Sequence, residues 1–261
     1  MNTNYLNELD QFAREILKEA GQAVKNPAKL TIDTKLHRKD LVTNMDKAIQ
    51  DMVFAKIADK YQDHKFLGEE EQENKARSMD GYVWILDPID GTQNFVYFRR
   101  DFVISLALFV DNVGMLGYVY DVVRDELYSA KKGMGAYVNS EPMECVNKEV
   151  TIDQGLLLTE HNALLKYKFA QACMDRAISV RMMGCCALEM IYVIAGRVSC
   201  YINGNCSGWD IAGAVVITEE MGIKISHMDG SEYSLLEDHV NLLVAKPEIH
   251  TELVEMYNTM G

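Results

Sequence analysis

A buried strand that ends in two carboxylates is the feature that most constrains this chain. Residues 82–86, with the sequence YVWIL, are typical of such a strand. Asp87 and Asp90 follow it, and the proline between them keeps the backbone extended. Gly91 then permits a sharp turn into a helix. Carboxylates beside the N–H groups of a helix start form a site for hard cations and phosphate together, so this segment predicts a chemistry as well as a fold.

Two shorter motifs accompany this segment. Gly68-Glu69-Glu70 follows the apolar pair 66–67, and residues 209–214 (WDIAGA) open an apolar helical pattern. Each is weak alone, because acidic runs are usually solvated and Asp-Pro or Asp-Gly are ordinary turn dipeptides. All three motifs together, in this order and at these separations, favour one site built from distant parts of the chain.

Together the motifs resemble the inositol monophosphatase family of magnesium-dependent, lithium-sensitive phosphatases, over nearly the whole chain. Residues 40–46 (DLVTNMD) are similar to the family's segment that contributes a water-activating aspartate, here Asp46. Residues 114–136 resemble its central strands and the glycine turn after them. The resemblance implies a layered αβαβα sandwich with the active site between its two halves.

The resemblance also implies the ligands of two or three Mg2+ ions. Glu69, Asp87 and the backbone carbonyl of Ile89 would hold the first ion, and Asp87, Asp90 and Asp210 the second, with a weaker third ion near Glu69. Mg2+ suits this set because it prefers hard oxygen ligands. A pair of ions about 3.5–4 Å apart can stabilise both the attacking and the leaving oxygen of a phosphate ester.

Some of these residues also have a purely structural interpretation. Thr92 is either an N-cap or a hydroxyl that contacts the attacking water and donates to Asp46, and the two roles are compatible. Asp210 is a candidate N-cap for the helix that begins there. Glu70 and Glu71 are expected to be solvated surface charge.

Substrate contacts are expected from both halves of the chain. The candidate substrate-binding residues are Asp90, Gly91, Thr92, Gly184, Cys185, Asn203 and Asp210. Asn203 stands where inositol-type relatives usually carry a glutamate, seven residues before the Trp-Asp aspartate, so it offers hydrogen bonds without charge. Arg99 and Arg100 follow the phosphate motif, and a second phosphate, a dimer partner and plain solvent all remain open for them.

The pattern of apolar residues divides the chain into an α+β half, 1–145, and an α/β half, 146–261. In the first half we expect helices at 6–24 and 43–61 (N-cap Thr43), a β-hairpin or mobile loop at 29–39, and strands near 82–86, 103–110, 115–121 and 126–131. In the second half we expect strands at 156–159, 180–182, 200–202 and 241–245, and helices at 162–177, 186–196, 210–221 and 247–258. The boundary near 143–152 lacks a flexible composition, which favours rigid packing.

Composition narrows the class of protein. A chain of 261 residues forms one large domain or two closely packed halves. The net charge of −13 argues against a broad nucleic-acid surface. The sequence shows neither a long apolar span nor a signal pattern, and its six cysteines lack CxxC spacing, so we expect reduced thiols, a cytoplasmic location and no membrane contact.

The predicted function is a Mg2+-dependent phosphomonoesterase of small soluble substrates, similar to inositol monophosphate or broader in range, which cleaves them by attack of an activated water. Alternatives within the family are an NADP(H) phosphatase and a fructose-1,6-bisphosphatase. A regulatory factor associated with the transcription machinery is the alternative from another class. By resemblance, the protein is expected to be a homodimer.

Overall fold

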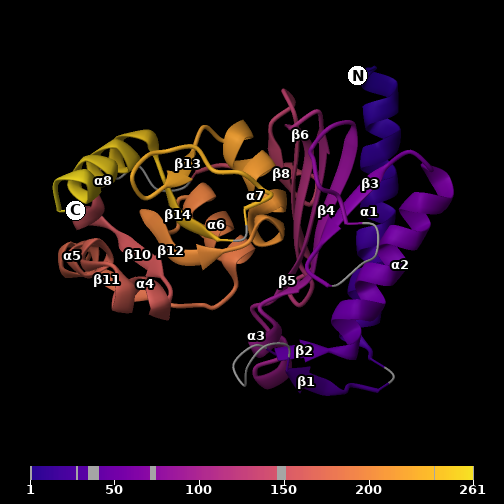
Figure 1. Ribbon diagram of the computed structural model, residues 1–261, viewed down its shortest axis with the longest axis horizontal. Helices are drawn as coiled ribbons and strands as arrows, with labels where there is room; N and C mark the ends of the chain where they lie inside the picture. Colours follow the sequence, from indigo (N-terminus) through magenta and orange to yellow (C-terminus); the bar gives the residue numbers. More distant parts are fainter. Residues whose placement is uncertain are drawn as a thin grey trace.

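The computed structural model describes residues 2–27, 29–34, 41–70, 75–145, 151–237 and 239–260. They form five layers: helices, a large sheet, helices, a small sheet and helices (Figure 1). The helices, taken layer by layer, are α1 (Thr3–Lys25) and α2 (Asn44–Lys60), then α6 (Cys186–Ile194) and α7 (Gly208–Glu220), then α4 (His161–Lys166), α5 (Lys168–Arg176) and α8 (Pro247–Met260). The expected αβαβα sandwich is confirmed.

The first helical layer forms where the apolar spacing predicts it. α1 buries one apolar stripe, including Leu9, Ala13 and Leu17, against the large sheet and α2. Thr43 is the N-cap of α2, as predicted, and it forms a capping box with Asp46. This box fixes Asp46 in the first turn of α2, where its side chain is almost fully buried.

The large sheet has the strand order β3-β4-β5-β6-β7-β8-β9. Its strands are β3 (Lys65–Gly68), β4 (Tyr82–Asp90), β5 (Val103–Val110), β6 (Val113–Asp121), β7 (Glu126–Lys131), β8 (Ala136–Val138) and β9 (Glu141–Pro142). β3 pairs with β4 in parallel, and every other neighbouring pair of this sheet is antiparallel. The antiparallel-rich sheet and all four strands predicted in this half are confirmed.

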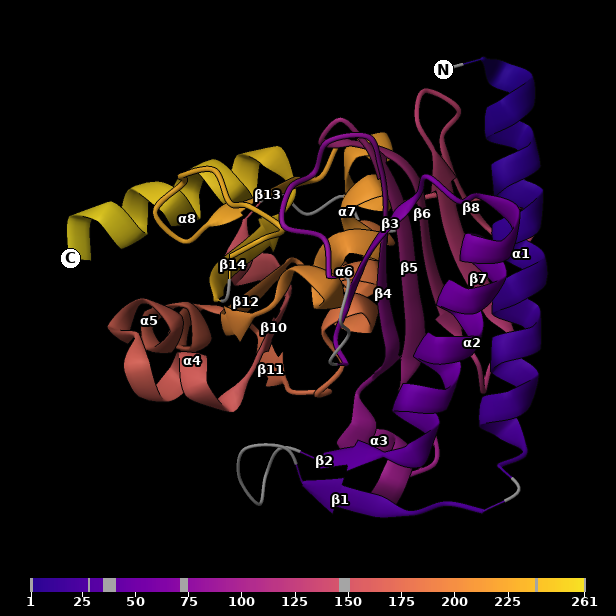
Figure 2. The same cartoon turned by 45° about the vertical axis from the view of Figure 1, so that its right-hand side comes forward.

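A two-stranded hairpin lies at one end of the large sheet, next to α3 (Thr92–Tyr97) and the start of α2 (Figure 2). β1 (Ile32–Thr34) pairs antiparallel with β2 (Leu41–Thr43). The predicted hairpin is therefore present in its arms. Residues 35–39 of that prediction, Asp40, Glu71 and the boundary residues 146–150 lie outside the described residues.

The small sheet has the order β11-β10-β12-β14-β13 and is mixed. Its strands are β10 (Leu156–Thr159), β11 (Ser179–Arg181), β12 (Cys200–Cys206), β13 (Lys224–His227) and β14 (Val240–Ala245), preceded by the 3-10 turn η1 (Ile152–Gln154). β10 runs parallel to β11 and β12, whereas β14 is antiparallel to β12 and β13. The predicted strands are present, but β12 extends beyond Ile202 to Cys206 and so includes Asn203.

Helix α7 packs very closely on the large sheet, and this contact places Asp210. A Cβ atom added at Gly117 of β6 would lie 2.5 Å from the carbonyl oxygen of Gly213 in α7. Glycine is therefore required at this position, because any side chain would push the helix away from the strand. The core that results joins the inner face of the large sheet to α6, α7 and the small sheet.

One predicted helix is interrupted. Residues 162–177 form α4 and α5 instead of one helix, and Tyr167 lies between them with φ −114° and ψ 114°. The ring of Tyr167 packs tightly over Gly204, where an added Cβ would lie 2.9 Å away. Tertiary packing thus overrides the local helical pattern. Among the residues that the structure describes, no helix combines the length and the apolar composition that crossing a membrane requires.

Candidate metal and phosphate site

A cavity of about 410 Å³ brings together the motifs of the sequence. The described residues that line it are Leu41, Glu69, Asp90, Gly91, Thr92, Gln93, Asn94, Gly184 and Asp210. They come from the start of β2, the residue after β3, the end of β4 with the first residues of α3, the loop before α6, and the first turn of α7. Three segments that are far apart in sequence, at Glu69, Asp90 and Asp210, therefore converge on one space.

Asp87 and Asp90 occupy the last part of β4, which continues through the proline. The strand reaches Asp90 instead of ending at Leu86, and its pairing with β5 shifts between Asp87 and Asp90. Asp87 is 2% exposed and accepts a hydrogen bond from the Ile89 backbone N–H at 3.0 Å. The expected extended backbone after residue 86 is confirmed; it brings Asp90 to the wall of the cavity, whereas Asp87 is buried and is not among the described residues that line it.

The N-terminus of α6 supplies the hydrogen-bond donors for Asp90. Its Oδ1 accepts from the Cys186 N–H at 3.1 Å, and its Oδ2 accepts from the Ala187 N–H at 2.6 Å. The thiol of Cys185 lies 3.3 Å from Oδ2. Burial raises the pKa of Asp90 to about 6, and the Ala187 N–H partly opposes this rise. Asp90 thus joins β4 to a helix of the second half.

The acidic residues are crowded in a way that fits divalent cations. Burial raises the pKa of Asp87 well above its usual range, and the nearby charges of Glu69, Asp90 and Asp210 raise it further. Carboxylates so close together repel one another unless protons or cations compensate them. Their hard oxygen atoms are the donors that Mg2+ prefers, so the residues present fit this ion.

A second cluster of acidic residues lies beside these carboxylates. Asp46, Glu69 and Glu70 each offer a carboxylate oxygen, and these atoms lie within 4.8 Å of one another. Glu70 is partly buried, and its backbone N–H donates to Gln50 Oε1 at 3.0 Å. The interpretation of Glu70 as solvated surface charge is therefore wrong: the hydrogen bonds between Gln50 and the Glu70 backbone turn this segment inward.

Thr92 and Asp46 are in direct contact, although Asp46 is not among the described residues that line the cavity. Thr92 Oγ1 lies 3.3 Å from Asp46 Oδ1 and 3.1 Å from the Ile89 carbonyl oxygen. Asp46 Oδ2 accepts from the hydroxyl of Thr43 at 2.6 Å and from its backbone N–H at 2.8 Å. Burial raises the pKa of Asp46, and the Thr43 hydrogen bonds oppose this rise.

The two proposed N-cap roles are wrong. Gly91, with φ 88°, is the N-cap of α3, and Thr92 is the first residue inside the helix. Ser207 is the N-cap of α7, and Asp210 lies three residues later, where its Oδ2 accepts from the Ser207 N–H at 2.8 Å. The Thr92 hydroxyl and the Asp210 carboxylate thus belong to the first turns of α3 and α7, from which both residues line the cavity.

Gly91 and Gly184 bring the two sides of the cavity into close contact. Both have a left-handed backbone, with φ 88° and 71°. A Cβ atom at Gly91 would lie 3.3 Å from the Gly184 carbonyl oxygen and 3.2 Å from Cys185 Cβ. Glycine is needed at residue 91 both for its conformation and for this approach.

Not every predicted substrate residue lines the cavity. Among the described residues, Cys185 and Asn203 are absent from its lining. Cys185 is buried behind Asp90. Asn203 is 8% exposed; its Nδ2 donates to the Tyr201 hydroxyl at 2.6 Å, and its Oδ1 accepts from the Asn205 N–H at 2.8 Å. Both polar groups of Asn203 are therefore engaged within its own strand.

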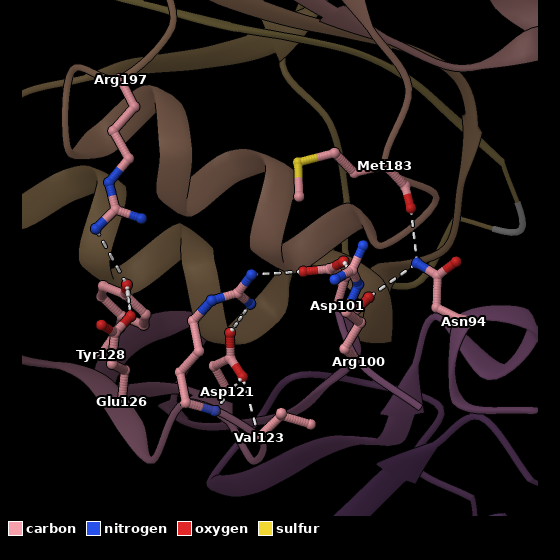
Figure 3. Close-up of polar contacts among 10 residues, drawn as sticks. Asn94, Arg100, Asp101, Asp121, Val123, Glu126, Tyr128, Met183 and Arg197 are labelled. Carbon is pink, nitrogen blue, oxygen red and sulfur yellow. Dashed lines mark hydrogen bonds and ion pairs between the residues drawn. The ribbon is translucent and has the colours of Figure 1, made fainter. Parts of the chain in front are cut away.

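The arginines after the phosphate motif are exposed. The Arg99 guanidinium lies over the Phe95 ring, 5.1 Å from its centre, and Arg100 Nε lies 3.4 Å from Asp101 Oδ2. Figure 3 shows this region. Asp101 Oδ1 also forms an ion pair with Arg124 Nη2, at 2.7 Å. Neither Arg99 nor Arg100 is among the described residues that line the cavity.

The sequence analysis missed three residues that line the cavity, Leu41, Gln93 and Asn94, and also the buried Glu189. Asn94 lines the cavity, and its Nδ2 donates to the carbonyl oxygens of Asp101 at 2.8 Å and Met183 at 2.6 Å (Figure 3). Glu189 is 1% exposed within α6, and its Oε1 accepts from the Met183 N–H at 2.8 Å. A single acidic residue inside the apolar run 186–195 was the signal that could have revealed Glu189.

Comparison with known proteins identifies the family of this chain. The sequence model described as "Inositol monophosphatase family" matches residues 5–259. An inositol-1-monophosphatase of Bacillus subtilis (strain 168) is 37% identical over 98% of this chain and 98% of its own length. Two solved structures are similar over most of their length. An IMPase/NADP phosphatase complexed with Mg2+ and phosphate has a TM-score of 0.89 and 30% identity, covering 97% of this chain and 96% of that one. A LiCl-soaked inhibitory complex of staphylococcal inositol monophosphatase-1 has a TM-score of 0.88 and 31% identity, covering 98% and 96%.

Proposed function

The chain belongs to the inositol monophosphatase family, and on this premise we propose how its own residues carry out the reaction. It is a Mg2+-dependent phosphomonoesterase, and its substrates are phosphate monoesters of the inositol monophosphate kind. The observation that carries the assignment of the site is the convergence of Glu69, Asp90 and Asp210 on one cavity beside the start of α3.

We assign the cation ligands as the sequence predicted them. Glu69, Asp87 and the Ile89 carbonyl would hold one Mg2+, and Asp87, Asp90 and Asp210 a second. The charges of Glu69, Asp90 and Asp210 raise the pKa of Asp87, and this closeness of the four carboxylates supports the assignment. When bound, Mg2+ supplies Lewis-acid stabilisation of the phosphate oxygens and makes a water acidic enough to lose its proton near neutral pH.

Thr92 and Asp46 would orient the attacking water. A hydroxyl has one proton, so Thr92 donates to a single acceptor at a time. Donation to Asp46 Oδ1 leaves the Ile89 carbonyl oxygen free to act as a ligand and turns a lone pair of Thr92 Oγ1 to the water. The distances of 3.3 Å and 3.1 Å from Oγ1 to these two acceptors support such an exchange.

We propose that the phosphate contacts the backbone N–H groups of Gly91 and Thr92, with Gly184 on the opposite wall. The hydroxyl groups on the alcohol part of the substrate would be bound weakly, because the polar groups of Asn203 already bond to Tyr201 and Asn205. A site that binds substrate hydroxyl groups weakly discriminates poorly between substrates. NADP is therefore a second candidate substrate, and the similar IMPase/NADP phosphatase favours it.

A homodimer is the assembly we propose. Several large apolar side chains are exposed near Asp101, with Tyr97 72%, Phe98 69%, Met182 52% and Val123 44% exposed. Contacts of Asp101 with Arg124 and of Asn94 with Met183 hold these segments together (Figure 3). A second copy would cover this apolar surface. Light scattering should then give a dimer for the wild type, a monomer for Phe98→Asp, and a dimer for the control Leu165→Asp.

We also propose a cytoplasmic location and two structural units, 1–145 and 146–261. The free cysteines support the location, because disulfides are rare in cytoplasmic proteins. The two sheets, each with its own outer helical layer, support the two units.

A phosphate-release assay tests the proposed function. Wild-type protein should hydrolyse inositol monophosphate with Mg2+, lose activity in EDTA and regain it when Mg2+ is restored. Asp87→Asn should be inactive, whereas Asp229→Asn, on the exposed turn before Ser231, should retain full activity. Equal activity of Asp87→Asn and wild type would refute the ligand assignment.

A further inference from the structure

A chain of hydrogen bonds crosses from the phosphate motif to a buried acid in the second half. Met183 is its centre: its carbonyl oxygen accepts from Asn94 Nδ2 at 2.6 Å, and its N–H donates to Glu189 Oε1 at 2.8 Å. One peptide segment is thus held on one side by α3 and on the other side by α6. Figure 3 shows the first of these contacts, between Asn94 and Met183.

Glu189 is engaged by more than Met183. The backbone N–H of Gly184 and the hydroxyl of Tyr201, which is fully buried, lie close enough to Glu189 to lower its pKa, against the larger rise caused by burial. Tyr201 in turn accepts from Asn203 Nδ2 at 2.6 Å. Glu189 therefore ties the loop before α6 to strand β12 of the small sheet.

The loop held by Glu189 sets where α6 begins. Gly184 lines the cavity and has φ 71°, and Cys185 after it is the N-cap of α6. The next two N–H groups, those of Cys186 and Ala187, are the donors to the Asp90 carboxylate. A shift of this loop would move both donors relative to Asp90, because they belong to the same first turn.

We propose that Glu189 is a positioning residue: by holding the Met183–Gly184 backbone, it sets the start of α6 against Asp90 and so aligns the cation site across the two halves. This inference rests on the proposed role of Asp90 as a cation ligand. Glu189 needs only to accept hydrogen bonds for this role. Burial raises its pKa to about 8, so a neutral carboxyl group at pH 7 is consistent with the contacts.

Two substitutions separate positioning from charge. Glu189→Gln retains an oxygen that can accept from Met183, and we expect its kcat within about twofold of wild type. Glu189→Leu has similar size but no acceptor. We expect its kcat to fall at least tenfold with a small change in KM, and its affinity for Tb3+ to fall at least threefold.

Tb3+ is the probe for cation binding, because it is a hard cation and its luminescence can be excited through Trp209, next to Asp210. The readout does not depend on turnover, so a wild type that binds Tb3+ but hydrolyses no phosphate ester would refute the proposed function alone. Thr218→Val is the matched control, since it removes a buried hydroxyl that donates along α7, to the Ala214 carbonyl oxygen at 2.7 Å. It should lower Tm by a few degrees while kcat and Tb3+ affinity stay within twofold.

Two results would overturn the inference. The first is a folded Glu189→Leu protein whose kcat and Tb3+ affinity stay within twofold of wild type, as for Thr218→Val. The second is a loss in Glu189→Gln as large as that in Glu189→Leu. If the leucine variant does not fold, Glu189→Asp replaces it: its shorter side chain should pull the loop inward and lower kcat and Tb3+ affinity by severalfold, and unchanged values would again overturn the inference.

Discussion

Replacing Asp210 with asparagine should remove catalysis and leave the fold intact. Asp210 has two tasks: its Oδ2 accepts from the Ser207 N–H at 2.8 Å in the capping box of α7, and its charge faces the cavity. An asparagine oxygen can still accept from Ser207, so the cap survives. The remaining loss of stability is the favourable interaction of the charge with the helix N-terminus, about 0.3–1 kcal/mol.

The substitution should have a small effect on stability and a large effect on kcat. A loss of up to about 1 kcal/mol lowers Tm by roughly 2–4 °C in a protein of this size. Loss of a ligand charge that stabilises the leaving oxygen costs several kcal/mol, and about 4 kcal/mol corresponds to roughly a thousandfold in kcat. We therefore expect Asp210→Asn to be nearly inactive at saturating Mg2+ and to melt within a few degrees of wild type.

Ser207→Ala is the matched control. It removes the cap hydroxyl and leaves the carboxylate, so Tm should fall by the effect of about 1 kcal/mol while kcat stays within severalfold of wild type. Phosphate release and thermal unfolding measure both quantities. Asp210→Asn activity above about a tenth of the wild-type rate would show that Asp210 is not a ligand. The same ligand argument predicts a comparable loss for Asp90→Asn.

Three further outcomes test other parts of the structure. Thr92→Ala and Asp46→Asn should each lower kcat strongly, and the double variant should lose little more, because the two residues act as a unit; multiplicative losses would exclude a shared role. Burial lowers the pKa of His64 from 6.5 to about 4. As the pH falls, the unfolded chain therefore binds a proton at His64 before the folded protein does. The free energy of unfolding should decline between pH 6.5 and 4, by at most about 3 kcal/mol. Urea unfolding should show a shallower decline in His64→Gln, and identical slopes would contradict this account. Wild type should cleave several phosphomonoesters with kcat/KM values within about two decades of one another; a wild type that cleaves inositol monophosphate alone would refute weak recognition of the alcohol part.

The sequence predicted those parts of the site that depend on local pattern. Strand β4 and its two aspartates could be found because an apolar run, a proline and a glycine each restrict the backbone in a known way. Thr43 could be recognised as an N-cap for the same reason. The layered sandwich and the cation ligands came from the resemblance of complete motifs, since no local rule states which distant carboxylates meet.

The misplaced residues depend on contacts that are distant in sequence. Thr92 and Asp210 look like N-caps by residue type, but Gly91 and Ser207 begin the helices, and a shift of one to three positions lies below the resolution of capping rules. Glu70 looks like surface charge until Gln50, from α2, bonds to its backbone. Tyr167 breaks a helical pattern because its ring packs on Gly204, a contact between segments with no shared local signal.

Besides the short helix α3, three helices begin at the acidic residues of the site: α2 with Asp46 in its first turn, α7 with Asp210 in its first turn, and α6 with its N–H groups on Asp90. Each helix N-terminus carries about half a positive elementary charge. The protein thus holds part of the compensation for its carboxylates permanently within its own backbone. When the ions leave, the carboxylates repel one another, and the helix N-termini offset part of this repulsion. We therefore expect the protein to stay folded while cations are exchanged. Stripping the ions with a chelator should therefore be reversible, and one folded scaffold can take up and release cations in response to their concentration.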